Sequence, residues 1–347
     1  MKTRVARLYA QRDLKVEEAD YAPPGPGEVL LAMAAGGICG SDLHYYQDGG
    51  FGPVRVREPI IAGHEASGFV AALGEGVDGL AVGQLVAVNP SQPCGHCRFC
   101  DIGQPIHCLN MRFMGSAMRL PHENGMFRDR FIVPAIQCHA VGGAVSPGEA
   151  ACAEPLAVCL HAVAQAGDLT GRSVLVTGAG PIGLLVVAAA RHAGAGEIVV
   201  TDLTDAALAR APAMGATQTI NVATNPDGLA PFQENKGTFD VAFDCSAAGP
   251  ALRSVFAAIR PRGTIVQVGV TGDMTIALNA LVAKEIVWRG SQRFHDEFAQ
   301  AVRLISTRGI DVRPIISHTF PLEQAVDAFE QAGDRTAACK VQLTFQS

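Results

Sequence analysis

Four closely spaced cysteines are the residues whose chemistry the sequence specifies most clearly. Cys94, Cys97, Cys100 and Cys108 follow the pattern C-x2-C-x2-C-x7-C. Four thiolates on one short segment can complete a tetrahedral shell around zinc, which leaves no open position for a substrate. The pattern therefore predicts a structural zinc site. The alternative is a set of free or redox-active thiols.

A second set of metal-ligating residue types is dispersed along the chain. Cys39 lies in Gly-Gly-Ile-Cys-Gly-Ser-Asp, His64 and Glu65 lie in Gly-His-Glu, and Glu154 lies in Cys-Ala-Glu-Pro. A thiolate, an imidazole and a carboxylate together suit a zinc ion that keeps one position open for substrate. Spacing alone does not establish this site, because an isolated cysteine or histidine is more often a packed interior residue.

A glycine-rich turn predicts a dinucleotide site. Residues 178–183 read Gly-Ala-Gly-Pro-Ile-Gly between an apolar strand and a helix, and Asp202 closes the next strand about 20 residues on. Such glycines permit a tight turn, let backbone amides approach a pyrophosphate and allow close helix packing. Asp202 is placed to bind the adenosine ribose, and its charge disfavours a 2′-phosphate, so we expect NAD rather than NADP. The expected cofactor-binding residues are Gly178, Gly180, Pro181, Ile182, Gly183 and Asp202. The alternatives are an ordinary glycine turn and an aspartate that only caps a helix.

Length and composition limit the classes of protein. The chain has 347 residues, which at roughly 150 per domain suggests two domains. Its net charge of −6 gives no reason to expect a nucleic acid or anionic membrane partner. The longest uncharged apolar run, residues 174–190, is broken by glycines and a proline, and no secretory signal is evident. We therefore expect a cytoplasmic protein whose cysteines bind metal rather than form disulfides.

The distribution of apolar runs predicts two kinds of domain. Before residue 150, short β-like runs are separated by glycine and proline, which predicts a small β-rich domain. After residue 170, apolar runs alternate with helical stretches, which predicts an α/β domain with a doubly wound parallel sheet. Its six expected strands are Val174–Thr177, Ile198–Thr201, Gln218–Asn221, Val241–Cys245, Thr264–Val268 and Ile286–Arg289. A helix is expected over Asp205–Met214, shortened or kinked by Pro212.

In combination, these motifs resemble the zinc-containing medium-chain dehydrogenases, and within them the polyol-oxidising branch. The segments that carry the resemblance are Gly37–Gln47, Asn89–Cys100, Met111–Met118, Glu154–Val158 and Ala338–Leu343. The resemblance implies a GroES-like catalytic zinc domain formed by residues 1–150 and 291–347, and a Rossmann NAD-binding domain formed by residues 151–290. It also implies two zinc ions per chain, a small-molecule sugar acid or polyol as the substrate, and a homotetramer.

The resemblance assigns roles near the catalytic zinc. Where simple alcohol dehydrogenases place a second cysteine ligand, this chain has Glu154. The ligands would be Cys39 and His64 together with Glu65 or Glu154, and water would complete the shell. The sequence does not choose between the two carboxylates, which could alternate during turnover.

The implied reaction is oxidation of a secondary alcohol with hydride transfer to NAD. The expected substrate is L-idonate, oxidised at C5 to 5-keto-gluconate. Ser41 would accept the proton first, His44 would pass it outward, and Tyr45 would contact substrate hydroxyls. The alternatives are local hydrogen bonding for Ser41 and His44 and simple packing for Tyr45.

A substrate carboxylate calls for a cation. The candidates are Arg112, Arg119, His122 and Arg293. Arg112 is the expected carboxylate anchor because of its position in the Met111–Met118 segment, and Arg293 is expected to bind hydroxyls. A plain surface charge is the alternative for each.

Three other functions compete with this prediction. The first is a sorbitol-, xylitol- or threonine-type dehydrogenase on the same scaffold. The second is a non-enzymatic, crystallin-like nucleotide-binding protein, which retention of Cys39, His64, Glu65 and Glu154 argues against. The third is a zinc-ribbon interaction module, which the small share of the chain taken by the cysteine lobe argues against.

Overall fold

The alternating strands and helices of the middle of the chain form a six-stranded parallel sheet. In the computed structural model, which describes residues 1–270, 272–276 and 278–346, the strand order is β15-β14-β13-β16-β17-β18. This is the doubly wound order of a dinucleotide-binding domain, so the predicted α/β fold is confirmed. The strands are β13 (Ser173–Thr177), β14 (Glu197–Asp202), β15 (Gln218–Asn221), β16 (Phe239–Asp244), β17 (Ile259–Gln267) and β18 (Val287–Gly290).

Helices pack on this sheet where the sequence places them, with one interruption. They are α5 (Pro181–His192), α6 (Asp205–Leu208), α7 (Gly249–Ala258) and α8 (Leu278–Ala283), with 3-10 turns at Pro212–Met214 and Ala230–Lys236. The helix expected over 205–214 ends at Leu208, and Pro212 starts the separate 3-10 turn. Proline lacks the amide that a continuous helix needs at this position, so the expected shortening is confirmed.

The remainder of the chain forms a β-rich part that includes both termini. A seven-stranded sheet has the order β12-β8-β7-β3-β20-β19, with β11 also paired to β3. Strand β20 runs antiparallel to β3, so the C-terminal segment completes a sheet begun by the N-terminal one. The strands of this sheet are β3 (Glu28–Gly37), β7 (Glu65–Leu73), β8 (Leu85–Val88), β11 (Arg130–Pro134), β12 (Cys138–Ala140), β19 (Ile316–Pro321) and β20 (Lys340–Thr344).

Smaller sheets and short helices surround this sheet. The smaller sheets consist of β1 (Lys2–Ala10) with β2 (Asp13–Asp20) and β6 (Ile60–Ile61), β4 (Gly50–Phe51) with β5 (Val54–Arg55), and β9 (Ser91–Gln92) with β10 (Arg112–Phe113). The helices are α1 (Gly40–Asp48), α2 (Arg98–Asp101), α3 (Pro147–Ala151) and α10 (Ala325–Gly333), and 3-10 turns occur at Pro105–His107, Ala135–Gln137, Arg313–Ile315 and Leu322–Gln324.

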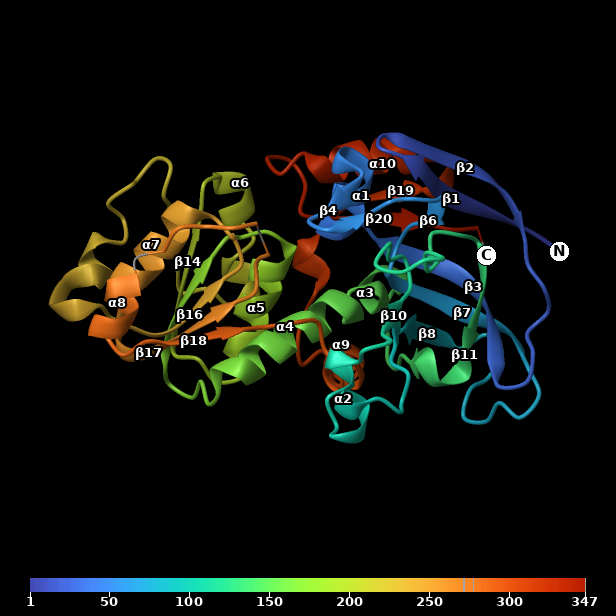
Figure 1. Ribbon diagram of the computed structural model, residues 1–347, viewed down its shortest axis with the longest axis horizontal. Coiled ribbons are helices and arrows are strands. Elements are labelled where there is room, and N and C mark those ends of the chain that lie inside the picture. The colour runs from blue at the N-terminus through green and yellow to red at the C-terminus, as the bar shows by residue number, and fades with distance from the viewer. Residues whose placement is uncertain (271, 277, 347) are drawn as a thin grey trace.

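Two helices, α4 (Ala153–Ala166) and α9 (Glu297–Ser306), lie between the two parts (Figure 1). Helix α4 packs against both α5 and α9, and nine of its fourteen residues are buried. The sequence analysis gave no helix for α4. A helix buried on several sides lacks the polar stripe that marks an amphipathic helix in a sequence.

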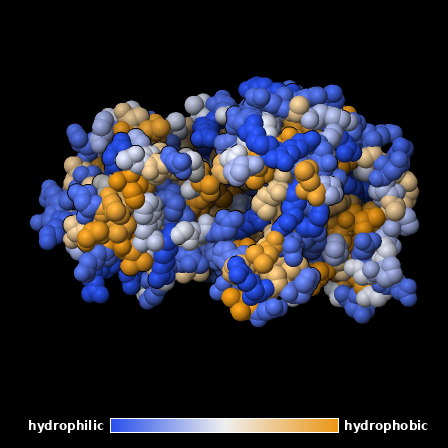
Figure 2. All heavy atoms as spheres, in the orientation of Figure 1, coloured by the Kyte–Doolittle hydropathy of each residue, from blue (hydrophilic) through white to orange (hydrophobic). Residues whose placement is uncertain are grey.

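The molecular surface is hollowed between the two parts, and apolar atoms line a portion of this hollow (Figure 2). One face of the parallel sheet and the sheet of the β-rich part each have a buried core of their own. A further cluster joins parallel-strand residues to α4, α5 and α9 and to Ala87 of β8. Within the described residues, no helix combines the length and the apolar character needed to cross a membrane.

Candidate metal and dinucleotide sites

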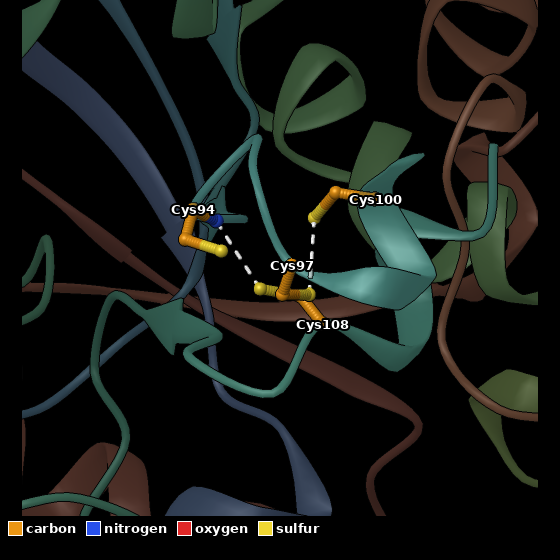
Figure 3. A group of neighbouring side chains, drawn as sticks. All are labelled: Cys94, Cys97, Cys100 and Cys108. Atoms are coloured by element: carbon orange, nitrogen blue, oxygen red, sulfur yellow. Dashed lines mark hydrogen bonds between the residues drawn. The ribbon is translucent and has the colours of Figure 1, made fainter. Parts of the chain in front are cut away.

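The four cysteines of the short lobe converge on one point. The side chains of Cys94, Cys97, Cys100 and Cys108 place their sulfur atoms within 4.8 Å of one another (Figure 3). Backbone amides already donate to these sulfurs, as the Cys94 amide does to Cys108 Sγ at 3.1 Å and the Leu109 amide to Cys97 Sγ at 3.4 Å. Hydrogen bonds from the Cys100 and Leu109 backbones lower the pKa of Cys97 to about 6. Burial, by contrast, raises the pKa of Cys100 to about 11. The four converging sulfur atoms fit a four-sulfur zinc site.

Strand pairing builds the dispersed cluster. Strand β3 ends at Gly37 and β7 begins at Glu65, and these two residues are register partners in the antiparallel ladder. Cys39 follows β3 directly and His64 precedes β7, so the same pairing brings both side chains to one place. The ligand atoms of Cys39, His64 and Glu65 all lie within 4.8 Å of one another. The sheet register therefore creates a donor set that suits zinc.

Asp42 orients this cluster, a role that the sequence analysis missed. Its side chain is fully buried, Oδ2 accepts from the Cys39 amide at 3.0 Å, and Oδ1 accepts from the Gly63 amide at 3.2 Å. Oδ1 also lies 3.7 Å from His64 Nδ1. Burial disfavours charge on His64, but Asp42 and Cys39 outweigh it and raise the His64 pKa. The signal in the sequence was an aspartate three residues after Cys39, the spacing of a side chain that caps a helix start.

Lys340 is a second residue that the sequence analysis missed. It is 3% exposed, and its Nζ donates to Glu65 Oε1 at 2.8 Å and lies 2.7 Å from Oε2. Both oxygens of the buried Glu65 carboxylate therefore lie within ion-pair distance of this ammonium group. A Cβ at Gly37 would collide with Oε2 of this carboxylate, which explains the glycine there. The only signal was a single lysine within an apolar strand.

Glu154 lies beside the cluster without joining the group of three. It occupies the first turn of α4 and is 5% exposed. Burial raises the pKa of Glu154 to about 7. The nearby His64 opposes this increase, and the nearby Glu65 carboxylate adds to it. The carboxylate that the structure groups with Cys39 and His64 is that of Glu65.

The glycine turn before α5 has the geometry that a dinucleotide requires. Gly178 has a φ of 91°, and a Cβ at Gly183 would lie 1.8 Å from the Gly178 carbonyl oxygen. Gly180 caps α5, Pro181 is its first residue, and a Cβ at Gly180 would meet only open space. The start of α5 is therefore open beside Gly180, as the approach of an anionic group to a helix N-terminus requires.

Asp202 lies at the end of β14 beside this turn. Its Oδ2 accepts from the Ala179 amide at 2.7 Å, and its Oδ1 accepts from the Leu203 amide at 2.7 Å. Thr204 rather than Asp202 caps α6, since the Thr204 hydroxyl accepts from the Ala207 amide. Asp202 therefore does not cap α6, and its carboxylate is held beside the glycine turn.

The predicted proton-transfer residues lie on α1, directly after Cys39. Ser41 and His44 are three residues apart, so their side chains share one face of the helix. His44 is 41% exposed and its Nδ1 lies 3.0 Å from Asp48 Oδ2. Tyr45 is buried, and its hydroxyl accepts from the Ala117 amide at 3.3 Å.

Three of the four predicted substrate cations have other partners. Arg112 forms an ion pair with Glu123, so the structure gives no support to Arg112 as a carboxylate anchor. Arg119 donates to the carbonyls of Met111 and Leu109 and thereby braces the cysteine lobe. His122 uses both ring nitrogens, since Nε2 accepts from the Arg57 amide at 2.9 Å and Nδ1 contacts the Arg119 carbonyl at 2.7 Å.

Arg293 is the predicted cation that reaches the metal cluster. Its guanidinium lies 4.4 Å from the centre of the Phe113 ring, and this ring also lies 5.6 Å from that of His64. Burial lowers the pKa of Arg293, while nearby Glu154 and Tyr45 oppose the change. Among the described residues, no carboxylate forms an ion pair with it, and its hydrogen bond goes to Met118 Sδ. Arg293 thus lies over the Phe113 ring, near Glu154, and has no ion pair with a carboxylate among the described residues.

Known proteins share this architecture along the whole chain. The alcohol dehydrogenase GroES-like domain family matches residues 25–143, and the zinc-binding dehydrogenase family matches residues 181–307. L-idonate 5-dehydrogenase (NAD(P)(+)) of Escherichia coli K12 is 41% identical over 91% of both chains. Sorbitol dehydrogenase of Bacillus subtilis is 34% identical over 95% of this chain and 93% of its own.

A solved structure agrees with these matches. The crystal structure of L-idonate 5-dehydrogenase from Escherichia coli K-12 superposes with a TM-score of 0.94 and 38% identity over 99% of both chains. The metal clusters, the dinucleotide turn and the two-part fold therefore have one explanation. The chain belongs to the zinc-binding dehydrogenases of the alcohol dehydrogenase type, in which a GroES-like domain is joined to a Rossmann domain.

Proposed function

We propose that this protein oxidises the C5 hydroxyl of L-idonate to 5-keto-gluconate and transfers the hydride to NAD. The observation that carries the substrate assignment is the position of Arg293, which lies over the Phe113 ring near Glu154 and has no ion pair with a carboxylate among the described residues. A guanidinium in that position suits a substrate that is an anion as well as a polyol. The likeness to L-idonate 5-dehydrogenase supports the same assignment.

Cys39, His64 and Glu65 would hold the catalytic metal, with Glu154 available as an alternative carboxylate. A zinc ion bound there supplies Lewis acidity, which lowers the pKa of the substrate hydroxyl. Asp42 fixes His64, and Lys340 fixes Glu65, so the ligands keep their orientation while one position remains for substrate. The four cysteines from 94 to 108 would hold the second, structural zinc.

The proton released from the hydroxyl needs a route to solvent. Ser41 would take it first and His44 would pass it outward, a proposal supported by their shared face of α1 and by the exposure of His44. Tyr45 would contact substrate hydroxyls, since its fixed hydroxyl lies near Arg293. NAD would accept the hydride, and Asp202 favours it over NADP because a 2′-phosphate would meet a carboxylate.

Arg293 replaces Arg112 as the proposed carboxylate anchor. The guanidinium of Arg112 is already paired with Glu123, whereas that of Arg293 lies over the Phe113 ring and has no ion pair with a carboxylate among the described residues. In this arrangement the C5 hydroxyl of the substrate would lie at the metal and the cofactor, and Arg293 would bind the carboxylate at the other end of the substrate.

A panel of sugar acids and polyols tests the function. The rates of reduction of NAD and NADP are compared with L-idonate, sorbitol, xylitol and threonine as substrates. We expect the highest kcat/KM with L-idonate and NAD. A higher kcat/KM for sorbitol or xylitol would favour the polyol alternative, and the absence of turnover with any substrate would favour a nucleotide-binding protein.

We further propose a cytoplasmic homotetramer. Leu278 and Val282 on α8 and Val287 on β18 are 60%, 67% and 41% exposed, and apolar atoms gather over α8 (Figure 2). Strand β18 is also an edge of its sheet, which suits pairing with a second copy. The free cysteines and the thiolate zinc site suit a reducing compartment. Sedimentation of the purified protein should give four chains per particle, and a monomer would contradict this proposal.

A further inference from the structure

Two chain segments connect the nucleotide domain to the β-rich part. The first is α4, which carries Glu154 in its first turn. The second runs from the end of β18 at Gly290 to the start of α9 at Glu297, and it carries Arg293. Helices α4 and α9 pack against each other (Figure 1). Side chains on α4 can therefore control the second segment directly.

The carboxylate of Glu297 links these two segments. His161 Nδ1 on α4 donates to Glu297 Oε1 at 2.9 Å, and the His295 amide donates to Glu297 Oε2 at 2.8 Å. His161 Nε2 accepts from Gln165 Nε2 at 3.2 Å, so a neutral imidazole satisfies both contacts. Burial favours protonation of Glu297, but the hydrogen bonds from His161 and His295 outweigh it and lower the pKa to about 2. The acceptor is therefore ionised.

The backbone at Arg293 needs external support. Its φ of 50° lies in the left-handed region, which is unfavourable for a residue with a side chain. The residue after Arg293, Phe294, is 2% exposed, and its ring packs against that of Phe298 in a tilted arrangement with ring centres 5.6 Å apart. The next residue, His295, is fixed through its amide by Glu297. Residues 293–295 form a corner that sets the direction of the Arg293 guanidinium. This corner is held by the buried Phe294 ring and by the Glu297 carboxylate.

We propose that Glu297, oriented by His161, is a positioning residue that holds the 293–295 corner so that Arg293 faces the substrate. This inference rests on the proposed role of Arg293 as a substrate contact. It predicts that Glu297 affects turnover only through Arg293. Within the described part of the chain, the hydrogen bonds of the Glu297 side chain go to His161 and to the His295 amide, and none goes to a metal ligand or to the dinucleotide turn.

A double-mutant cycle tests the coupling. In the Glu297→Ala variant, we expect kcat/KM for L-idonate to fall roughly threefold to tenfold, mainly through KM, because one partly buried hydrogen-bonded support is lost. In an Arg293→Met background, the same substitution should cause no further loss. Equal losses in both backgrounds would overturn the proposal, since Glu297 would then act independently of Arg293.

Conservative and control variants separate positioning from general stability. Glu297→Gln keeps an acceptor for the His295 amide and can donate to His161 after a change of tautomer, so it should retain most of the activity. Glu323→Ala removes a carboxylate that pairs with Arg4 and should leave KM unchanged. A loss with Glu297→Gln as large as with Glu297→Ala would contradict the proposal.

Amide hydrogen exchange at His295 gives a readout that does not depend on the substrate. We expect faster exchange in Glu297→Ala than in the wild type and in Glu323→Ala. If exchange at His295 becomes faster in Glu297→Ala but the wild type does not oxidise L-idonate, the proposed function is wrong and the positioning role of Glu297 is kept. The double-mutant cycle is then repeated with the polyol that the enzyme does oxidise. Unchanged exchange would overturn the positioning role whatever the substrate.

Discussion

The two candidate metal sites of the β-rich part are built in opposite ways. The cysteine site draws all four ligands from residues 94–108, and backbone amides of the same segment and its flanks donate to the sulfurs. The Cys39 site draws its ligands from separate segments and depends on the β3–β7 register to bring them together. Its orienting residues, Asp42 and Lys340, come from α1 and β20.

The difference reflects what each site has to do. A closed shell needs only to hold a lobe together, and a local set of identical ligands is sufficient. A site that keeps one position open must fix the remaining ligands by other means. Buried hydrogen bonds and the Glu65–Lys340 ion pair supply this rigidity. The dispersed site thus depends on the whole domain, and the local site supports only its own lobe.

The largest effect should come from the dispersed site. Cys39→Ser should lower kcat/KM by roughly a thousandfold or more, because several kcal/mol of transition-state stabilisation by the metal are lost. The melting temperature should change little, since Cys39 is only partly buried. Cys138→Ser, at another partly buried cysteine outside both clusters, is the matched control and should keep its activity. Full activity in Cys39→Ser would contradict the catalytic assignment.

A change at the cysteine site should affect the stability of the protein rather than its turnover. Cys94→Ser should lower the melting temperature by roughly 5–10 °C, because the lobe has few apolar contacts and depends on zinc for its shape. Turnover per folded molecule should remain near that of the wild type. Thermal melts and active-site titration together check this expectation. A variant that keeps its melting temperature and loses turnover would assign the lobe to catalysis.

Arg293 and Arg112 should also differ in their effect, here on substrate binding. Arg293→Met should lower kcat/KM for L-idonate by roughly tenfold to a hundredfold, because a charge-assisted contact is lost. A neutral polyol should lose less. Arg112→Ala is the matched control and should have little effect, since its guanidinium is already paired with Glu123. The reverse pattern, with the larger loss in Arg112→Ala, would restore Arg112 as the anchor.

A smaller effect should come from the residues that orient the ligands. Asp42→Asn should weaken zinc binding at the Cys39 site by roughly tenfold, because an amide cannot accept from both the Cys39 and Gly63 backbones. Zinc retention against a chelator measures this effect. Unchanged retention would show that His64 is fixed without Asp42.

The sequence predicted what its local patterns contain and missed what only the fold assembles. The cysteine lobe, the glycine turn and the six strands of the parallel sheet each have a signature within one short segment. Helix α4 lacked such a signature because it is buried on several sides. Asp42 and Lys340 were missed because their partners lie elsewhere in the chain. Arg112 was preferred to Arg293 because the sequence does not reveal the pairing of Arg112 with Glu123.

Stepwise removal of zinc tests the central contrast most directly. A chelator is titrated into the wild-type protein while zinc content, turnover and melting temperature are followed in the same samples. Loss of the first zinc, from the open site, should abolish turnover while the melting temperature stays near its starting value. Loss of the second should then lower the melting temperature. Simultaneous loss of both properties in one step, or turnover that survives until the second zinc leaves, would contradict the assignment of one catalytic and one structural site.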